Sequence, residues 1–288
     1  MLAIYKRELK SYFRSFIGFL FIAVTLFFLG LYFSVYNLMN GYPYFAYVVS
    51  SVTFLFMLTV PILTMRILAE EKRSKTDQLI LTAPVSVGGI VMGKFLALLT
   101  IFAIPVAIIC FYPLIMAQYG SVPMGEAYLS ILAYFLFGMT AIAIGLFLSS
   151  LTESQSIAAV GTFAALLCLF LWEGLVSFLP VTATGSLVGL LVITAFLALG
   201  VSALTNSWKP GAGVLAAGWA AIIGAYVWDS DQFSGLLPDL FGRFSLITAF
   251  DNFALDHVFD ISGVVLYVTL ALLALFLTVQ VVQKRRWS

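Results

Sequence analysis

A cluster of charged side chains stands between two long apolar segments of the chain, at residues 66–77. Seven of these twelve residues are charged, although only 9% of the whole chain is Asp, Glu, Lys or Arg. They are Arg66, Glu70, Glu71, Lys72, Arg73, Lys75 and Asp77. Charged groups need water or an ionic partner, so the chemistry that this cluster offers is recognition of another protein in water. A solvated turn between two apolar segments is the alternative.

One acidic residue lies inside an apolar segment, where its charge is costly. Glu173 follows Trp172 within the apolar residues 156–179. An ionisable group at membrane depth is by default a candidate for substrate or proton contact. Glu173 is therefore a candidate for the substrate path. The alternative is a hydrated, structural position beside Trp172, because Glu173 lies near one end of the segment.

Residue sets for metal binding or covalent catalysis are sparse. Cys110 and Cys168 both lie in apolar segments, and His257 is the only histidine. Metal sites need clustered Cys and His ligands, so we expect no metal site, no catalytic residues and two cysteines that pack as small apolar groups. His257 lies between Asp256 and Asp260, which could form an outer metal or pH-sensing site, but a solvated loop histidine is the simpler interpretation.

The composition predicts a membrane protein. Hydrophobic residues make up 62% of the 288 residues, so polar groups could not cover a globular surface. A helix needs about 20 apolar residues to cross a bilayer, and only helices or closed barrels satisfy the backbone there. The apolar segments are continuous rather than alternating, which predicts an all-α helical bundle. Eight segments qualify: 16–39, 45–68, 89–117, 127–151, 156–179, 183–205, 210–228 and 261–283.

The polar breaks at 180–185 and 205–211 are weak, so residues 180–228 form either two full spans or a re-entrant hairpin. In the second case the bundle has six spans. We treat residues 1–288 as a single transmembrane domain.

The distribution of basic residues predicts the orientation. With eight or six spans, thirteen Lys and Arg residues fall on one side, which is then the cytoplasm, together with both termini. They are Lys6, Arg7, Lys10, Arg14, Arg66, Lys72, Arg73, Lys75, Lys94, Lys209, Lys284, Arg285 and Arg286. Only Arg243 falls on the opposite side. The cluster at 66–77 is therefore expected in the cytoplasm.

Two segments outside the predicted spans are amphipathic. Residues 1–15 place apolar side chains on one helical face and Lys6, Lys10 and Arg14 on the other, as in a helix that lies in the inner head-group layer. This helix either anchors the chain only or also contacts a cytoplasmic partner. Residues 229–260 mix acidic residues with apolar residues at helical spacing, which predicts short helices on the extracytoplasmic side.

A short helix is expected within residues 69–88. Ser74 to Asp77 match the Ser/Thr-x-x-Asp/Glu pattern of a helix start. Pro84 ends this helix, and Ser86 can cap the next one. The helix would lie across the cytoplasmic ends of two spans, with an apolar edge that could fill a groove on a partner.

Residues 69–88, which we call the elbow, resemble the corresponding segment of the type-2 permeases of ATP-binding cassette (ABC) transporters. That family includes permeases related to gliding motility and copper-enzyme maturation. The family often has two acidic residues, a basic pair, Gly-Thr, Leu-Glu-Leu-Leu, then Thr-x-Pro-Val-Ser and Gly-Lys. The matching residues are Glu70, Glu71, Arg73, Thr76, Leu79, Leu81, Thr82, Pro84, Val85, Ser86, Gly93 and Lys94. Lys75 replaces the usual Gly and Gln78 the usual Glu, which affects how the elbow meets its partner. The resemblance is firm over residues 1–155 and weaker beyond.

The resemblance implies a permease subunit of an exporter in the cell inner (plasma) membrane, without ATPase activity of its own. The sequence agrees, because it contains no G-x-x-x-x-G-K-[ST] loop. ATP and Mg would bind to a separate cytoplasmic ATPase, and the chain itself would hold no cofactor. The residues that would contact the ATPase are Glu70, Glu71, Arg73, Thr76, Gln78, Leu79, Leu81 and Pro84. Glu153, in the hairpin at 152–156, is either a second contact or a helix cap.

The expected partners are the ATPase, a second permease chain (identical or related), membrane lipid and, as a further candidate, an extracytoplasmic accessory protein. No nucleic-acid partner is expected. The alternative function is an ATP-independent transporter or channel, and a third is a membrane enzyme. The former class usually carries several ionisable groups near the midplane, and the latter needs clustered catalytic groups. Neither feature is evident here, and an adjacent ATPase gene would favour the ABC permease.

Overall fold

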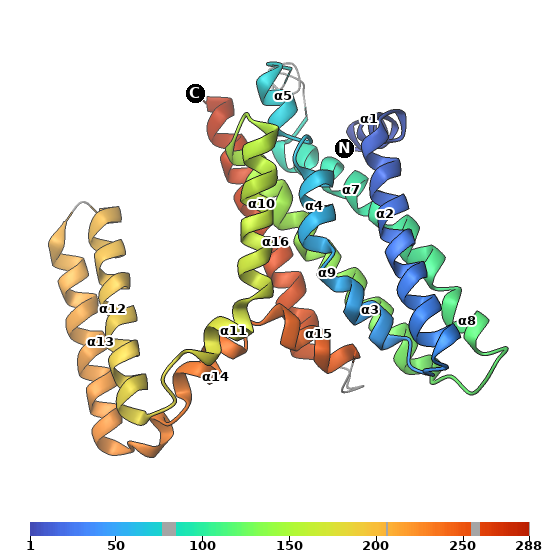
Figure 1. Cartoon of the computed structure of the whole chain (residues 1–288). Coiled ribbons are helices and arrows are strands. Elements are labelled where there is room, and N and C mark those ends of the chain that lie inside the picture. Colours follow the sequence, from blue (N-terminus) through green and yellow to red (C-terminus); the bar gives the residue numbers. More distant parts are fainter. Residues whose placement is uncertain (77–84, 206, 255–259, 288) are drawn as a thin grey trace. The chain divides into compact units, whose positions relative to one another are not determined.

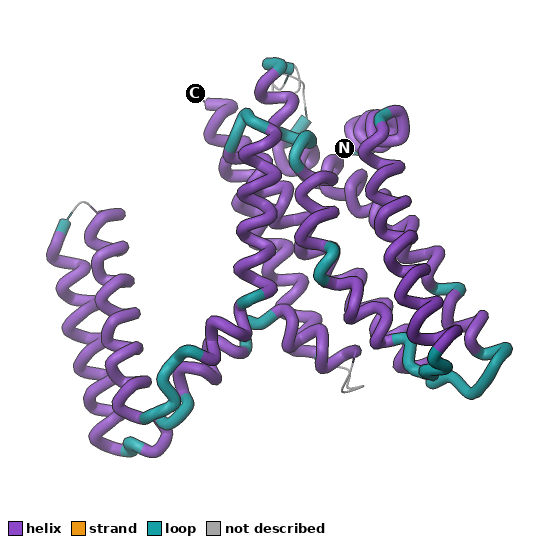
Figure 2. The backbone as a smooth tube through the Cα atoms, in the orientation of Figure 1, coloured by secondary structure: helices purple, strands orange, loops and turns teal. Residues whose placement is uncertain are grey.

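The computed structural model describes residues 1–76, 85–205, 207–254 and 260–287, and every regular element in them is helical (Figures 1 and 2). The predicted all-α class is therefore confirmed for the described residues. Within them, six helices are long and apolar enough to cross a membrane. They are Phe16–Met39, Val87–Met116, Met124–Leu151, Ala183–Ala203, Trp208–Trp228 and Ile261–Arg285.

The other two predicted spans are interrupted. Residues 45–68 correspond to α3 (Ala46–Thr53) and α4 (Phe56–Thr64), and the helix axis bends by 60° at the break between them. Thr53 and Thr59 flank this break, and each donates its hydroxyl to a backbone carbonyl four residues earlier, a contact that often bends helices. If the bent pair is one span, the count is seven.

The span predicted at 156–179 is shorter than expected. The structure has α10 at Gln155–Phe170, with 16 residues, and a separate short helix, α11 (Trp172–Ser177), after a break at Leu171. The total of eight spans, like the orientation of the termini, stays a prediction.

The chain divides into two compact units, which are described separately. Unit 1 contains residues 1–170 and 246–288, and unit 2 contains residues 171–245. The predicted extracytoplasmic segment 229–260 is therefore divided. It contributes η2 (Asp231–Phe233) and α14 (Leu236–Gly242) to unit 2, and α15 (Leu246–Ala254) to unit 1. Short helices were expected there, and His257 lies outside the described residues.

Unit 1 begins with α1 (Leu2–Arg14) and α2 (Phe16–Phe33), which continues into a turn of π-helix, η1 (Ser34–Met39). After α4 comes the short α5 (Ala69–Arg73). Then follow α7 (Val87–Ile109), α8 (Tyr112–Met116), α9 (Met124–Leu151) and α10, and the unit closes with α15 and α16 (Ile261–Trp287). The predicted cap is confirmed, because the Ser86 hydroxyl accepts a hydrogen bond from the Gly89 N–H.

The core of unit 1 lies around α9, which packs against α4, α7, α10, α15 and α16. Aromatic side chains fill its centre. The centroid of the Phe56 ring lies 5.5 Å from that of the Phe102 ring and 4.7 Å from that of the Tyr134 ring. Near one end, Gly145 lets α9 approach α4, since a Cβ atom there would lie 2.4 Å from Thr64 Oγ1. Helix α7 ends at Ile109. Pro113, four residues later, has no backbone N–H, so the Ile109 carbonyl lacks its usual helical hydrogen-bond partner.

Unit 2 is built on two consecutive long helices that pack side by side, α12 (Ala183–Thr205) and α13 (Trp208–Trp228) (Figure 1). The Trp219 indole N–H, on α13, donates to the Leu191 carbonyl of α12 over 3.2 Å. Each helix is long enough to span a bilayer by itself. Most of their apolar surface is exposed within the chain, as expected of helices that face lipid or another protein.

Candidate functional site

The charged elbow begins with α5, and α9 fixes its position. The backbone N–H groups of Leu68 and Ala69 both donate to Ser149 Oγ, each over 3.3 Å, and this hydroxyl donates to the Met65 carbonyl over 3.2 Å. The buried Lys72 ammonium donates to the Ser150 carbonyl. The last turn of α9 thus supplies the polar partners that the backbone needs where α4 turns into α5.

A buried ion cluster joins α5 to α1 and α7. The Lys94 side chain, on α7, is 0% exposed, and its Nζ lies 3.1 Å from Glu8 Oε1 and 2.8 Å from Glu71 Oε2. The same ammonium donates to the Ile67 carbonyl over 2.9 Å. Two hydrogen bonds and the ion pair with Glu71 give the ammonium three oxygen partners, and such pairing is the condition for burying a lysine charge.

Arg7 completes this cluster from its exposed side. One guanidinium nitrogen, Nη2, lies 2.5 Å from a carboxylate oxygen of Glu8 and 2.5 Å from one of Glu71. Two cations and two carboxylates therefore meet, and their formal charges cancel. Burial alone would raise the pKa of Glu8, but Lys94 and Arg7 outweigh that effect and hold the pKa of Glu8 below its usual value.

The N-terminal helix α1 is attached to the same region by aromatic and polar contacts. The buried Tyr12 hydroxyl donates to the Leu63 carbonyl of α4 over 2.8 Å, and burial raises the pKa of Tyr12. Arg66 lies over the Tyr12 ring, 5.3 Å from its centroid, and donates to Ser11 Oγ over 3.2 Å. Gly93 lets α1 lie close to α7, because a Cβ atom there would be 3.1 Å from the Met1 carbonyl oxygen. These contacts connect α1, α4, α5 and α7 at one end of unit 1.

The elbow residues predicted to contact a partner differ in their surroundings. Glu70, Arg73 and Thr76 are exposed, and Glu70 pairs with Arg66 over 3.0 Å. Glu71 is half-buried by the ion cluster. Gln78, Leu79, Leu81 and Pro84 lie outside the described residues, as does the helix expected after Ser74. The contact of these residues with a partner stays a prediction.

Lys75, in the elbow, has a left-handed backbone conformation, with φ of 56°. Glycine adopts this conformation freely, whereas other residues rarely do. The position is the one at which the permeases that this elbow resembles usually have glycine. The departure noted in the sequence therefore falls at a residue whose backbone geometry favours the family's usual choice.

The two remaining predicted residues are not members of the ion cluster. Glu153, between α9 and α10, lies 3.5 Å from the Arg285 guanidinium of α16, and its side chain is 67% exposed. Glu173 lies in the first turn of α11, in unit 2, with an exposed side chain. Their roles at an ATPase contact and in a substrate path stay predictions.

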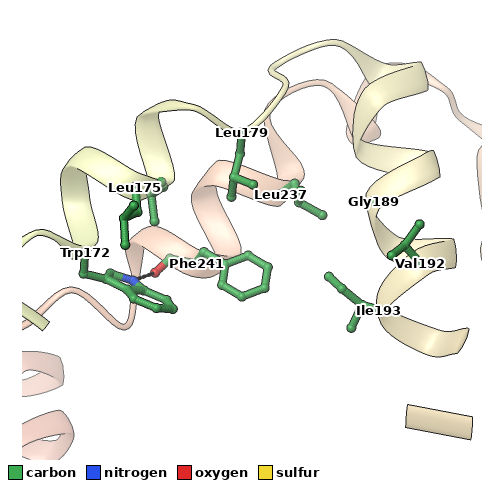
Figure 3. A pocket seen from close by; sticks show the side chains of 9 residues that line it. Trp172, Leu175, Leu179, Gly189, Val192, Ile193, Leu237 and Phe241 are labelled. Carbon is green, nitrogen blue, oxygen red and sulfur yellow. Dashed lines mark hydrogen bonds between the residues drawn. The ribbon is translucent and has the colours of Figure 1, made fainter. Parts of the chain in front are cut away.

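Unit 2 contains an apolar pocket of about 390 Å³ between α11, α12 and α14 (Figure 3). Its lining includes Leu175, Val192, Ile193 and Leu237. Trp172 also lines it, and the indole N–H of Trp172 donates to the Phe241 carbonyl over 2.8 Å. Glu173 is not among the residues that line it. The pocket therefore offers no support for the predicted role of Glu173.

Glu8 was not recognised as a functional residue from the sequence. It lies one helical turn after Tyr5 and one before Tyr12, on the apolar face of α1, and Lys94 lies in an otherwise apolar helix. A carboxylate on the apolar face of one helix and a lysine in an otherwise apolar helix indicate a buried pair, and this signal was available. The sequence alone could not show that Glu71 joins them, because its neighbours in the elbow are also charged.

The long apolar helices define a multi-pass membrane protein. The model of the family described as ABC-2 family transporter protein matches residues 32–282, so the chain belongs to that family of ABC transporter permeases. The comparison with curated proteins gave no match.

Proposed function

We propose that this chain is the membrane subunit of an ABC exporter, which couples ATP hydrolysis in a separate cytoplasmic ATPase to movement of a substrate across the plasma membrane. The observation that carries the proposal is the way in which α5 is held. Glu70 and Arg73 of α5 are exposed. The rest of α5 is held by buried ion pairs and hydrogen bonds with α1, α7 and α9. The family match supports a partner ATPase.

This arrangement suits the transmission of force. A partner that pulls on a loosely attached loop would move only that loop, whereas α5 shares buried contacts with three other helices. Breaking the Lys94 cluster would leave charges unpaired away from water, so α5 and its neighbours move together at lower cost. ATP binding in the partner would then shift the equilibrium between two arrangements of the spans.

The remaining parts of the proposal follow from the family and from the charge distribution. ATP and Mg bind to the partner, and two permease chains form a dimer. Both termini, α1 and the elbow face the cytoplasm, where anionic lipid attracts the basic face of α1. Glu153 provides a second contact with the ATPase, and an extracytoplasmic accessory protein could meet the opposite side.

The test is co-purification of the ATPase with the tagged chain in mild detergent, followed by mass spectrometry. Reversing two elbow charges, Arg73→Glu with Lys75→Glu, should reduce the recovered ATPase at least tenfold, because two basic side chains that the partner is proposed to meet would then be acidic. Glu71 is unsuitable for this test, since its reversal would also disrupt the buried cluster.

Lys209→Glu is the matched control, because it reverses an exposed lysine that is expected on the same side of the membrane. It should leave recovery of the ATPase unchanged. Equal recovery from the elbow variant and the control would refute the proposed contact. If the wild-type chain recovers no ATPase and transports without ATP after reconstitution, the ATP-independent transporter is the better interpretation.

A further inference from the structure

The apolar pocket of unit 2 has no part in the proposed coupling. It lies between α11, α12 and α14, and its volume is about 390 Å³ (Figure 3). Among the described residues that line it, Trp172 alone has a polar atom in its side chain. That indole N–H already donates to the Phe241 carbonyl. The lining side chains therefore offer a bound molecule apolar contacts and no free hydrogen-bonding group.

The walls of this pocket can be reached from outside. Leu175 of α11 and Val192 of α12 both line it, and they are 52% and 48% exposed. Elsewhere in the lining, α14 lies close to α12 at Gly189, where a Cβ atom would be 2.8 Å from Leu237 Cδ2. Figure 3 shows lining side chains from all three helices around the space that remains. A molecule can thus enter past Leu175 and Val192 and touch three helices at once.

Water would fill this space poorly. A water molecule in a pocket needs about two to four polar partners, and the lining side chains provide none that is free. If the space stays empty, its walls lose the dispersion contacts that a filled pocket supplies. An apolar molecule is therefore the occupant that stabilises the pocket.

The position of the pocket along α12 corresponds to the level of acyl chains. This helix is long enough to cross a bilayer. Gly189 and Ile193 lie six and ten positions after its first residue, Ala183, which is about 9 and 15 Å along the helix axis. A hydrocarbon layer is about 30 Å thick, so in a spanning α12 these residues lie within one leaflet, deeper than the head groups.

The volume separates two apolar occupants, an acyl chain and a helix of a partner protein. At about 30 Å³ for each group of water size, the pocket holds about 13 methylene groups, which is most of one acyl chain. A helix with its side chains is about 10 Å across and would use up the same volume within one turn. The pocket therefore suits a single flexible chain better than a helix.

We propose that this pocket binds one acyl chain of a bilayer phospholipid, whose head group stays outside it. The chain packs against Trp172, Leu175, Ile193 and Phe241, and neither a hydrogen bond nor a charge contributes to its recognition. Binding should therefore depend on the chain and be indifferent to the head group. The proposal goes beyond the coupling to an ATPase and does not rest on it.

A phospholipid with a photoreactive diazirine in its acyl chain tests the proposal on the full-length wild-type protein. The delipidated protein is irradiated in detergent with about one lipid for each chain, and mass spectrometry of its peptides locates the label. Leu175 and Ile193 should carry roughly tenfold more label than Phe196 and Leu197, because contacts on several sides bind a chain more tightly than an open helix surface.

Phe196 and Leu197 are suitable references because they are 70% and 60% exposed and lie on α12 outside the pocket lining. Equal labelling of the lining and these references would overturn the proposal, since it would show unselective contact with lipid. Absence of label from the lining would also overturn it, in favour of a protein occupant that excludes the chain.

The head group is the second variable of the test. Photoreactive phosphatidylcholine and phosphatidylglycerol with identical chains differ in charge and in hydrogen-bond donors. They should label the lining equally, because the lining side chains have no charge and no free polar group. A preference of roughly tenfold for either lipid would show that the head group is recognised, and would contradict the proposal.

Two matched variants locate the bound chain. Val192→Phe enlarges a side chain of the lining, and Val188→Phe makes the same change one helical turn earlier, at a valine that is 57% exposed and outside the lining. Val192→Phe should remove most of the label from Ile193, and Val188→Phe should preserve it. If both variants keep the label, the chain binds elsewhere.

The comparison of labelled residues in the wild-type protein stands even if Val192→Phe fails to fold. These measurements involve no ATPase, so their failure would leave the proposed coupling untouched.

Discussion

The two units of the chain are both apolar and helical, but different contacts hold their helices together. In unit 1, buried polar groups connect helices that are distant in the sequence: Lys94 joins α7 to α1 and α5, and Thr140 of α9 donates to the Tyr267 carbonyl of α16 over 3.0 Å. The most apolar part of α9 is 61% buried within the chain. Unit 1 thus has a core of its own.

Unit 2 has much less internal burial. The most apolar parts of α12 and α13 are only 11% and 6% buried within the chain. The hydrogen bonds of Trp172 and Trp219 described above join the helices of unit 2. Apolar helices that bury so little against their own chain must be covered by lipid or by another protein. The comparison teaches that specificity of packing in this protein comes from buried polar contacts in unit 1, while the surroundings stabilise unit 2.

The largest effect should come from removing the charge at the centre of the ion cluster in unit 1. Lys94→Met leaves Glu8 and Glu71 facing each other beside Arg7 alone, and breaking a buried pair in this way costs roughly 3–5 kcal/mol. Thermal unfolding in detergent should show this loss as a large fall in melting temperature. Lys209→Met, at an exposed lysine of unit 2, should change stability by less than about 0.5 kcal/mol. Equal melting temperatures for the two variants would show that the ion cluster does not stabilise unit 1.

A smaller effect should follow from closing the gap between α9 and α4. Gly145→Ala places a Cβ atom 2.4 Å from Thr64 Oγ1 and 2.9 Å from Thr64 Cβ. Thr64 is fully buried and branched at Cβ, so it cannot swing aside, and overpacking of this kind costs about 1–3 kcal/mol.

Gly161→Ala in α10 is the control, because a Cβ atom there meets no atom within 4 Å. It should be neutral or stabilise by up to about 1 kcal/mol, as the higher helix propensity of alanine predicts. Chemical unfolding of the two variants in the same detergent measures both. If Gly145→Ala is also stabilising, α9 and α4 do not approach as closely as described.

The smallest effect should be a dependence of stability on acid. Lys94 and Arg7 lower the pKa of Glu8 in the folded protein, so the folded state binds fewer protons than the unfolded state. This contribution is complete above the unfolded value of about 4.3, and it is lost as the pH falls through the lower folded value. Melting temperatures measured between pH 7 and pH 3 should fall less steeply at the acid end in Glu8→Gln than in the wild type. Parallel curves would contradict the assignment.

Much of unit 1 could be predicted from the sequence, because its signals are local. Continuous apolar segments predicted the helices, and Ser86 before an apolar segment predicted the cap of α7. The breaks at residues 54–55 and at Leu171 were not predicted. No glycine or proline stands at either break, and the hydrogen bonds of Thr53 and Thr59 become evident only from the helix geometry.

The candidate site could be predicted only in part. The charge density at residues 66–77 indicated an elbow, but not which charges are turned inward. Glu70 and Glu71 are adjacent in sequence, yet one is exposed beside Arg66 and the other is held by Lys94. That difference depends on where α1 and α7 pass, which no local pattern encodes. The division of residues 229–260 between two units likewise depends on tertiary contacts.

The short helix α10 has a consequence for the membrane around it. Its 16 residues give a length of about 24 Å, less than the roughly 30 Å of a typical hydrocarbon layer. A hydrophobic element shorter than the bilayer is accommodated by local thinning of the lipid. If α10 crosses the membrane as predicted, we expect the acyl chains next to it to be compressed or disordered.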